Sequence, residues 1–274
     1  MAKRYKKAFT LIELLVVISI IGLLSTIAVV NLQSSRAKAT IAAGQQQDTS
    51  IYHAVGDQMI GEWLFNEGSG TTAADTSGNN FNGTVNGATW TIGESGNALS
   101  FVTGNYVALG NSPALDPSNF TITAWIKPGD FSATGGGYGY IFSNARDCCG
   151  TYNGIELRVV NGQLLGEIWN GGVAYLYSKG TISNNPVWTF VAFSYNGSKM
   201  ALYVNGHLDN VVNSVNGVGS PASYSTYIAG MGMAPGSYGI SGSIDQVRLY
   251  GSAIVSANIE KLYLAERDKY MAKK

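Results

Sequence analysis

The sequence predicts a long N-terminal α-helix, an all-β antiparallel sandwich and a short C-terminal helix. Three observations predict this architecture: an apolar run near the N-terminus, a sharp change of composition at Gly61, and a polar helical stretch at the end. With 274 residues, the chain can hold an elongated stem and one domain of about 200 residues.

The apolar run extends from Phe9 to Leu32 and contains one ionisable side chain, Glu13. A helix over this run would cross roughly 30 Å of hydrocarbon, at about 1.5 Å per residue. Four basic residues precede it: Lys3, Arg4, Lys6 and Lys7. This flank predicts a cytoplasmic N-terminus, a single membrane crossing and an extracytoplasmic remainder.

Neither a secretory signal peptide nor a plain membrane anchor accounts for both the length of this run and the presence of Glu13. A secretory signal peptide has a shorter apolar core, of about 7–15 residues, followed by a cleavage site. A plain membrane anchor fits the length, but the lone carboxylate of Glu13 would cost about 2–3 kcal/mol in lipid without a partner.

The residues AFTLIELLVVISIIGLL resemble the class III signal of type IV pilins and of type II secretion pseudopilins. The resemblance implies that a prepilin peptidase cuts between Ala8 and Phe9, that the new N-terminus is methylated, and that the apolar segment remains as a stem. Glu13 would then pair with the N-terminal amine of a neighbouring subunit during filament assembly. Ala8 departs from the glycine usual before the cut, and the absence of proline before Pro113 removes the common mid-stem kink.

The same resemblance implies partners and a location. The partners are other pilin subunits, the prepilin peptidase and the pilus assembly machinery. The location is the inner membrane first, and then an extracellular filament or the cell surface. The predicted boundaries are a cleaved basic leader at 1–8, a stem helix at 9–59 with a transmembrane half at 9–32, a head at 60–264, and a polar tail at 265–274.

From Gly61 onward, short aromatic and β-branched runs alternate with clusters of Gly, Asn, Ser and Asp. In FTITAWI the apolar residues Phe120, Ile122, Ala124 and Ile126 fall on one face of a strand. The Asn-Gly pairs in VNGQ at 160–163 and VNGH at 204–207 predict hairpins. These patterns predict many short antiparallel strands in a sandwich, and the stretch from Ser256 predicts the closing helix.

Charge and cysteine usage exclude some classes of function. The formal net charge is zero, with 17 basic and 17 acidic residues, and removal of the four leader residues leaves 13 against 17, a net of −4. This balance argues against a nucleic-acid partner. Cys148 and Cys149 are adjacent, which allows a vicinal disulfide or two free thiols but does not match zinc-ligand spacing.

The order of segments from about residue 62 to residue 263 resembles the laminin-G-like family of concanavalin A-type jelly rolls. Three of the segments are WLFNEGSGTTAADTSGNNFNG at 63–83, FTITAWIKP at 120–128 and GSIDQVRLYGSAI at 242–254. The resemblance implies a jelly-roll head for adhesion or ligand binding, often of glycans, with a structural calcium ion. Candidate calcium ligands are Asp75, Asn80 and Asp245, although an Asx-turn within its own loop would equally explain Asp75.

Aromatic residues in glycine-rich loops are candidates for a sugar platform. Trp169 precedes a glycine turn, with Tyr138, Tyr152 and Tyr175 near it in sequence. The alternative is that these rings close the end of the sandwich.

The carboxylate pattern argues against catalysis. Some jelly rolls hydrolyse glycans with an E-x-D-x-x-E triplet on one strand, and this chain has no such triplet. Glu156 and Glu167 are single carboxylates in separate candidate strands. The sequence therefore predicts a non-enzymatic filament subunit with a glycan-binding head. The alternatives are a type II secretion pseudopilin that contacts an exported protein and, less favoured, a membrane-anchored glycan-processing enzyme.

Overall fold

The computed structural model describes residues 11–22, 25, 54–129, 138–145, 153–182, 187–213, 217–218, 225–232 and 234–271, with side chains up to residue 267. The chain divides into two compact units, Met1–Gln46 and Gln47–Lys274.

In the first unit, residues 11–22 form a helix whose apolar side chains are exposed, from 45% at Val17 to 80% at Leu11. Among the described residues, no helix is both long enough and apolar enough to cross a membrane. Most of the stem helix predicted at 9–59 lies outside the described residues, so its full length stays a prediction.

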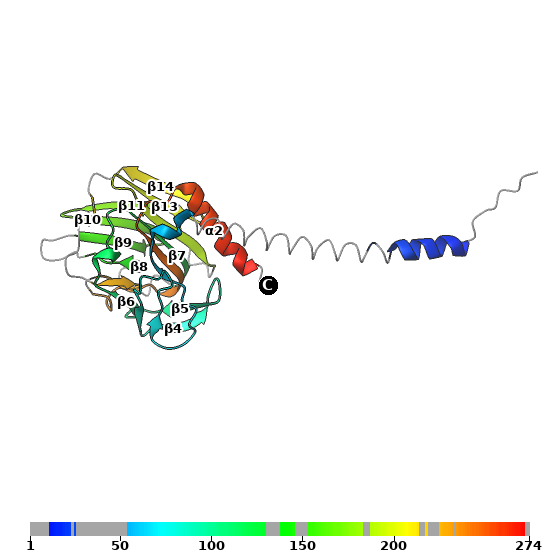
Figure 1. Ribbon diagram of the computed structural model, residues 1–274, viewed down its shortest axis with the longest axis horizontal. Coiled ribbons are helices and arrows are strands. Elements are labelled where there is room, and N and C mark those ends of the chain that lie inside the picture. The colour runs from blue at the N-terminus through cyan, green and yellow to red at the C-terminus, as the bar shows by residue number, and fades with distance from the viewer. Residues whose placement is uncertain are drawn as a thin grey trace, which may run out of the picture. The chain divides into compact units, whose positions relative to one another are not determined.

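The second unit is an antiparallel sandwich of two eight-stranded sheets, with α2 against one of them (Figure 1). The first sheet has the order β14 (His207–Asn213), β13 (Lys199–Val204), β12 (Thr189–Tyr195), β7 (Phe120–Pro128), β16 (Gly242–Tyr250), β5 (Asn97–Phe101) and β4 (Thr89–Ile92), and β1 (Met59–Trp63) also pairs with β16. The second sheet has the order β11 (Val173–Thr181), β10 (Gln163–Asn170), β9 (Asn153–Val160), β8 (Tyr138–Ser143), β15 (Thr226–Ile228), β6 (Tyr106–Gly110), β3 (Gly83–Asn86) and β2 (Thr72–Ala73). The helices are the short η1 (Gly56–Gln58) and η2 (Pro113–Leu115) and the C-terminal α2 (Ser256–Met271).

Both predicted Asn-Gly hairpins are confirmed. Val160 pairs with Gln163 across Asn161 and Gly162, whose φ angles are 50° and 81°. Asn205 and Gly206 make the same kind of turn between β13 and β14, with φ angles of 49° and 79°. Left-handed φ at both central residues is what a two-residue hairpin turn requires, and Asn and Gly adopt it at least cost.

The main core lies between the two sheets and follows the alternation of the strands. In β7, the predicted set Phe120, Ile122, Ala124 and Ile126 is fully buried in this core. The residues between them in sequence face the other way. The antiparallel sandwich predicted from alternation and turn signals is therefore confirmed, together with the C-terminal helix.

A second apolar cluster lies on the outer face of the first sheet, where α2 covers it. Ile259, Leu262 and Ala265 of α2 belong to one cluster with Trp125 of β7. Val55, just before η1, is 2% exposed and belongs to the same cluster. The chain thus reaches the sandwich on the outer face of the first sheet.

Candidate functional site

The outer face of the second sheet carries a cluster of ionisable and aromatic side chains. In β9, Ile155, Leu157 and Val159 enter the core, so Glu156 and Arg158 project from the opposite face. The short hairpin then fixes which residues of β10 lie beside them. Glu156 is the direct cross-strand neighbour of Glu167, and Arg158 is that of Leu165.

Glu167 has a second cross-strand neighbour, Tyr175 of β11. Trp169 lies opposite Gly154, which has no side chain to compete for the space above the strand. The structure therefore gathers Glu156, Glu167, Trp169 and Tyr175 on one patch. Glu156 and Glu167, single carboxylates in separate strands, thus become neighbours, because directly opposed residues have Cβ atoms only about 4.5–5.5 Å apart.

Arg158 holds the two glutamates together. Its Nη2 lies 2.6 Å from Oε2 of Glu167, and its Nε lies 3.8 Å from Oε2 of Glu156. The hydroxyl of Ser143 donates to Oε1 of Glu156 at 3.2 Å. Burial lowers the pKa of the Arg158 guanidinium, but Glu167, Tyr140 and Glu156 together raise it above its ordinary value. The guanidinium is therefore a permanent cation at the centre of the patch.

Two tyrosine rings enclose this cation. The guanidinium carbon of Arg158 lies 5.1 Å from the ring centre of Tyr138 and 5.3 Å from that of Tyr140, and its Nη1 donates to the Tyr140 hydroxyl at 3.0 Å. Such stacking orients the guanidinium and shields it from water. We call Tyr138, Tyr140, Glu156, Arg158, Glu167, Trp169 and Tyr175 the Arg158 face.

The Arg158 face includes three of the four predicted ligand-binding residues, Trp169, Tyr138 and Tyr175. Tyr175 is 61% exposed and makes an edge contact with Tyr177, with ring centres 6.0 Å apart. Tyr152 lies outside the described residues, as do Cys148 and Cys149. The role of these rings in sugar binding stays a prediction.

The predicted calcium ligand Asp75 is a hydrogen-bond acceptor for three backbone amides. Its Oδ1 accepts from Glu62 and Ser77, both at 2.9 Å, and its Oδ2 accepts from Phe81 at 2.8 Å. The bond from Ser77 closes an Asx-turn, the alternative that the sequence left open. Burial raises the pKa of Asp75, but these amides hold it below its usual value.

Asp245 lies where β16 changes its partner from β5 to β1, and it binds a different loop. Its Oδ2 accepts the amides of Glu94 at 2.9 Å and Ser95 at 3.2 Å, while its Oδ1 is buried without a hydrogen-bond partner among the described residues. Burial raises the pKa of Asp245 to about 7, although these amides lower it.

Asp75 and Asp245 accept backbone amides from different parts of the chain. In the part of the chain that the structure describes, no three His, Cys, Asp or Glu side chains are grouped so that they could hold a metal. Asn80 is exposed in its loop, with a φ of 61°. The calcium site of Asp75, Asn80 and Asp245 remains a prediction.

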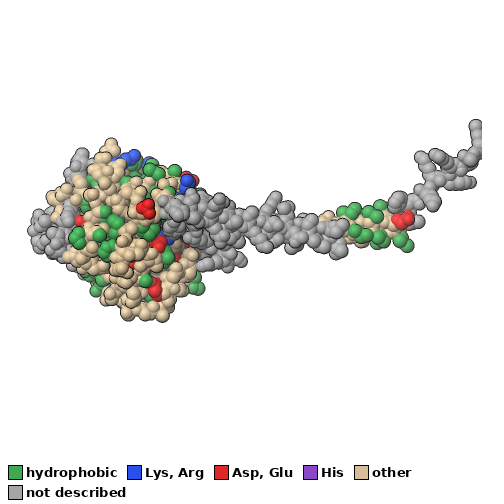
Figure 2. Space-filling model, viewed as in Figure 1, with side chains coloured by type: hydrophobic (Ala, Val, Ile, Leu, Met, Phe, Trp, Pro, Cys, Tyr) green, Lys and Arg blue, Asp and Glu red, His purple; other side chains and the backbone are tan. Residues whose placement is uncertain are grey.

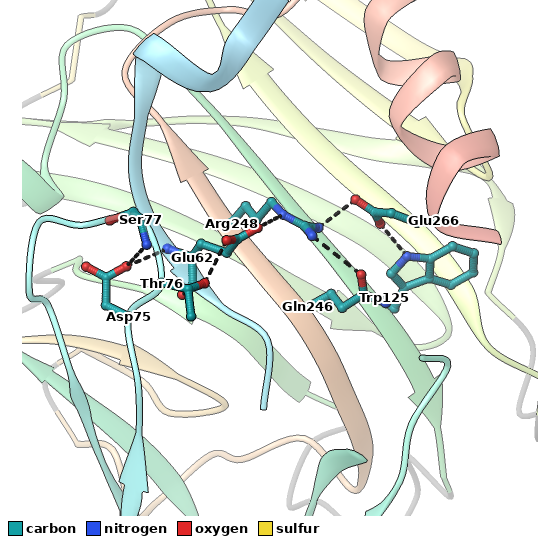
Figure 3. A network of polar contacts seen from close by, with 8 residues as sticks. All are labelled: Glu62, Asp75, Thr76, Ser77, Trp125, Gln246, Arg248 and Glu266. Carbon is teal, nitrogen blue, oxygen red and sulfur yellow. Dashed lines mark hydrogen bonds and ion pairs between the residues drawn. The ribbon is translucent and has the colours of Figure 1, made fainter. Parts of the chain in front are cut away.

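The Asp75 loop is connected to the C-terminal helix by a buried polar chain, which Figure 3 shows. Arg248 is 1% exposed; its Nε lies 2.7 Å from Glu62, and its Nη1 lies 2.6 Å from Glu266 of α2. Glu266 also accepts the indole N–H of Trp125 at 2.6 Å. No local sequence pattern indicates this network, because Glu62 and Arg248 are separated by 186 positions. This network fixes α2 to the first sheet.

A groove of about 790 Å³ lies beside α2, away from the Arg158 face. Its lining includes Trp188 with Lys127 6.0 Å from the ring centre, and Tyr263 with Arg267 5.5 Å from the ring centre. Figure 2 shows few charged side chains on the face of the head that it views. We place the candidate site on the Arg158 face, because there opposed carboxylates, a cation and exposed rings converge.

Comparison with known proteins yields matches at both ends of the chain. A laminin G family model, described as the concanavalin A-like lectin/glucanases superfamily, matches residues 101–260. The prokaryotic N-terminal methylation motif, the type IV pilin signal, matches residues 3–29. No curated protein matches the chain.

Three solved structures illustrate the likeness of fold. Domain 4 of AbnA, an extracellular arabinanase from Geobacillus stearothermophilus in complex with arabinotriose, has a TM-score of 0.60 and 18% identity, over 75% of this chain and 98% of that domain. The binding domain of Paraclostridial Mosquitocidal Protein 1 has a TM-score of 0.59 and 17% identity, over 76% and 52%. The ligand binding domain of botulinum neurotoxin serotype D, in complex with N-acetylneuraminic acid, has a TM-score of 0.57 and 17% identity, over 78% and 52%.

This chain spans about half the length of the two toxin domains. At these identities the likeness shows the fold alone. The family model covers more than half of the chain, and its range contains every residue of the Arg158 face. The chain therefore belongs to the concanavalin A-like lectin/glucanases superfamily and carries the type IV pilin signal at its N-terminus.

Proposed function

We propose that this chain is a subunit of a type IV pilus-like filament whose head binds a glycan on the Arg158 face. The observation that carries the proposal is the placement of this face. The chain reaches the sandwich on the outer side of the first sheet, and the Arg158 face is the outer side of the second sheet. In a two-layer sandwich these sides point away from each other, so a ligand on the Arg158 face would not compete with α2 for the same surface.

The N-terminal motif and the exposed apolar helix support the filament part of the proposal. Cleavage before Phe9 would free an amine four positions from Glu13, and pairing of that amine with the Glu13 of a neighbour would offset the cost of burying both charges. The apolar side chains at 11–22 would be covered by lipid before assembly and by neighbouring stems afterwards.

The chemistry of the Arg158 face supports the glycan part. Exposed aromatic rings provide flat surfaces for the apolar faces of sugars, and a carboxylate beside them can accept hydrogen bonds from hydroxyl groups. Trp169 and Tyr175 lie beside Glu167, so stacking and hydrogen bonding are available within one sugar length. Two of the similar domains were solved with arabinotriose and with N-acetylneuraminic acid, which adds support for a carbohydrate ligand.

A matched pair of surface variants tests the proposal. Tyr175→Ala removes an exposed ring from the Arg158 face, and Ile92→Ala removes an 81% exposed side chain from β4 of the other sheet. Full-length chain in detergent is applied to a glycan array and to insoluble polysaccharides. We expect Tyr175→Ala to weaken binding by about 1–3 kcal/mol, as loss of a stacking ring in a hot spot does, and Ile92→Ala to leave it unchanged. Equal effects of the two variants would reject this face as the site.

The filament system is a separate question with its own test. As a pilus subunit the chain would be found in long surface fibres, and its deletion would reduce adhesion. As a pseudopilin of type II secretion it would contact an exported protein, and its deletion would block release of that protein. We favour the pilus-like filament because the Arg158 face offers a built sugar platform.

Glycan hydrolysis is a second candidate, favoured by the opposition of Glu156 and Glu167. Retaining glycosidases hold two carboxyl groups about 5–5.5 Å apart. Here, however, the glutamates are 2% and 6% exposed and both are engaged by Arg158, which favours a role in orienting a ligand. If the full-length chain releases reducing sugar and Glu167→Gln abolishes this release, the function of the Arg158 face is catalysis and not binding alone.

A further inference from the structure

The centre of the Arg158 face carries more negative than positive charge. One guanidinium stands against two carboxylates, at 2.6 Å from Glu167 and 3.8 Å from Glu156. Both carboxylates are buried, so water screens them less than it screens surface charges. When both glutamates are ionised, the described side chains of the face leave an excess of one negative charge.

The cation is also unavailable to an incoming anion. Tyr138 and Tyr140 stack on the guanidinium of Arg158, Tyr140 accepts one of its N–H groups, and its side chain is only 15% exposed. An anionic ligand would have to displace Glu167 from a 2.6 Å ion pair to reach the guanidinium. An uncharged sugar needs no such displacement, because it can stack on the exposed ring of Tyr175 without reaching the buried charges.

From this arrangement we infer that the Arg158 face selects uncharged glycans and rejects glycans that carry carboxylates, such as uronic or sialic acids. The inference rests on the proposed glycan-binding function and adds the chemical class of the ligand. Like charges that meet in a desolvated contact lower affinity by about tenfold or more. Glu156 and Glu167 would thus act as specificity-determining residues, and Trp169 and Tyr175 would supply the stacking.

The test compares ligands that differ only in charge. Full-length chain in detergent is titrated with neutral oligosaccharides and with their carboxylated counterparts, for example the methyl ester of sialyllactose against sialyllactose and methyl-esterified against de-esterified galacturonan. We expect at least one neutral glycan to bind, and its acidic counterpart to bind at least tenfold more weakly. The discrimination should shrink as salt is raised, because added salt screens the charges at the edge of the face.

Charge variants then assign the discrimination to the two glutamates. Glu156→Gln/Glu167→Gln keeps the side-chain shapes and changes the local charge from −1 to +1. We expect it to reduce or reverse the preference for neutral glycans by at least tenfold. If the double variant fails to fold, Glu167→Gln alone should shift the preference in the same direction. Glu260→Gln, on the exposed side of α2, is the matched control and should change nothing.

The outcomes separate this inference from the function on which it rests. If acidic glycans bind as well as neutral ones, the charge selection is wrong while glycan binding stands. If neutral glycans are preferred but the glutamine variants keep that preference, Glu156 and Glu167 do not determine it. If no glycan of either class binds the wild-type chain, the proposed function and this inference both fail.

Discussion

Replacement of Glu266 by alanine removes the contact that joins the C-terminal helix to the sandwich. In the folded head, the carboxylate of Glu266 lies 2.6 Å from Nη1 of Arg248 and accepts the indole N–H of Trp125 at 2.6 Å (Figure 3). Both ionised side chains are 1% exposed. Water cannot replace the lost carboxylate without opening the contact between α2 and the sheet.

The expected loss of stability follows from what remains buried. Removal of one partner of a buried ion pair costs about 3–5 kcal/mol, because the other charge stays desolvated. Glu62 would still pair with Arg248 at 2.7 Å, which places the loss toward the lower end. The orphaned indole N–H adds to the loss, since a buried donor without a partner costs about 1–3 kcal/mol. We therefore expect Glu266→Ala to lower the free energy of unfolding by about 4 kcal/mol.

Urea denaturation of the full-length chain in detergent, followed by tryptophan fluorescence, measures this loss. Trp125 reports on the contact directly, because its ring packs against Phe190 and Tyr263. Glu266→Gln keeps an acceptor oxygen for the indole and should lose less than Glu266→Ala. Glu260→Ala, on the exposed side of α2, is the matched control and should change stability by less than about 0.5 kcal/mol.

Two results would refute the reasoning. A loss below about 1 kcal/mol for Glu266→Ala would mean that the buried pair contributes no more than an exposed one. An equal loss for Glu260→Ala would mean that the helix itself, and not the ion pair, responds to substitution.

Three further predictions concern other sites. Burial raises the pKa of Asp245 from 3.8 in the unfolded chain to about 7 in the folded head, so the folded head binds the proton of this carboxyl more tightly. The stability that this proton contributes is full below about pH 4 and is lost as the pH rises through 7. Denaturation midpoints measured from about pH 5 to 8 should therefore fall in the wild type and fall less in Asp245→Asn. Asp75→Asn should cost about 1–3 kcal/mol in calcium and in EGTA alike, because its carboxylate accepts three backbone amides; a loss confined to calcium would instead assign an ion to Asp75. Mass spectrometry of protein from its native host should find a mature chain that begins with methylated Phe9, whereas a chain that retains Ala8 would indicate a plain membrane anchor.

The β-sandwich could be predicted from the sequence because the signals for its strands and turns are local. Alternation in FTITAWI identifies the core face of β7, and the two Asn-Gly pairs identify two hairpins. The turn at Asn161 and Gly162 also determines the register of β9 against β10. Pairing Val160 with Gln163 and counting outward along both strands sets Glu156 opposite Glu167. The opposition of these carboxylates was therefore readable from the sequence.

Other parts of the site depend on contacts that no local pattern encodes. Asp245 and Glu94 are separated by 151 positions, and their contact exists because β16 leaves β5 at that point. Asp75 illustrates a different limit: a loop rich in oxygen ligands suggests calcium, but the same oxygens can accept backbone amides. Which role applies depends on the direction of the amide N–H groups, and residue type alone does not determine that direction.

The separation of the two outer faces would let one head carry both proposed roles. The outer face of the first sheet is covered by α2, which the pair of Arg248 and Glu266 fixes there. The Arg158 face lies on the outer side of the second sheet, beyond the core, and stacked sheets are about 10 Å apart. Substitutions on well-separated surfaces are usually additive in free energy. If the Arg158 face binds a glycan as proposed, changes of its exposed residues are therefore expected to leave the packing of α2 on the first sheet unchanged.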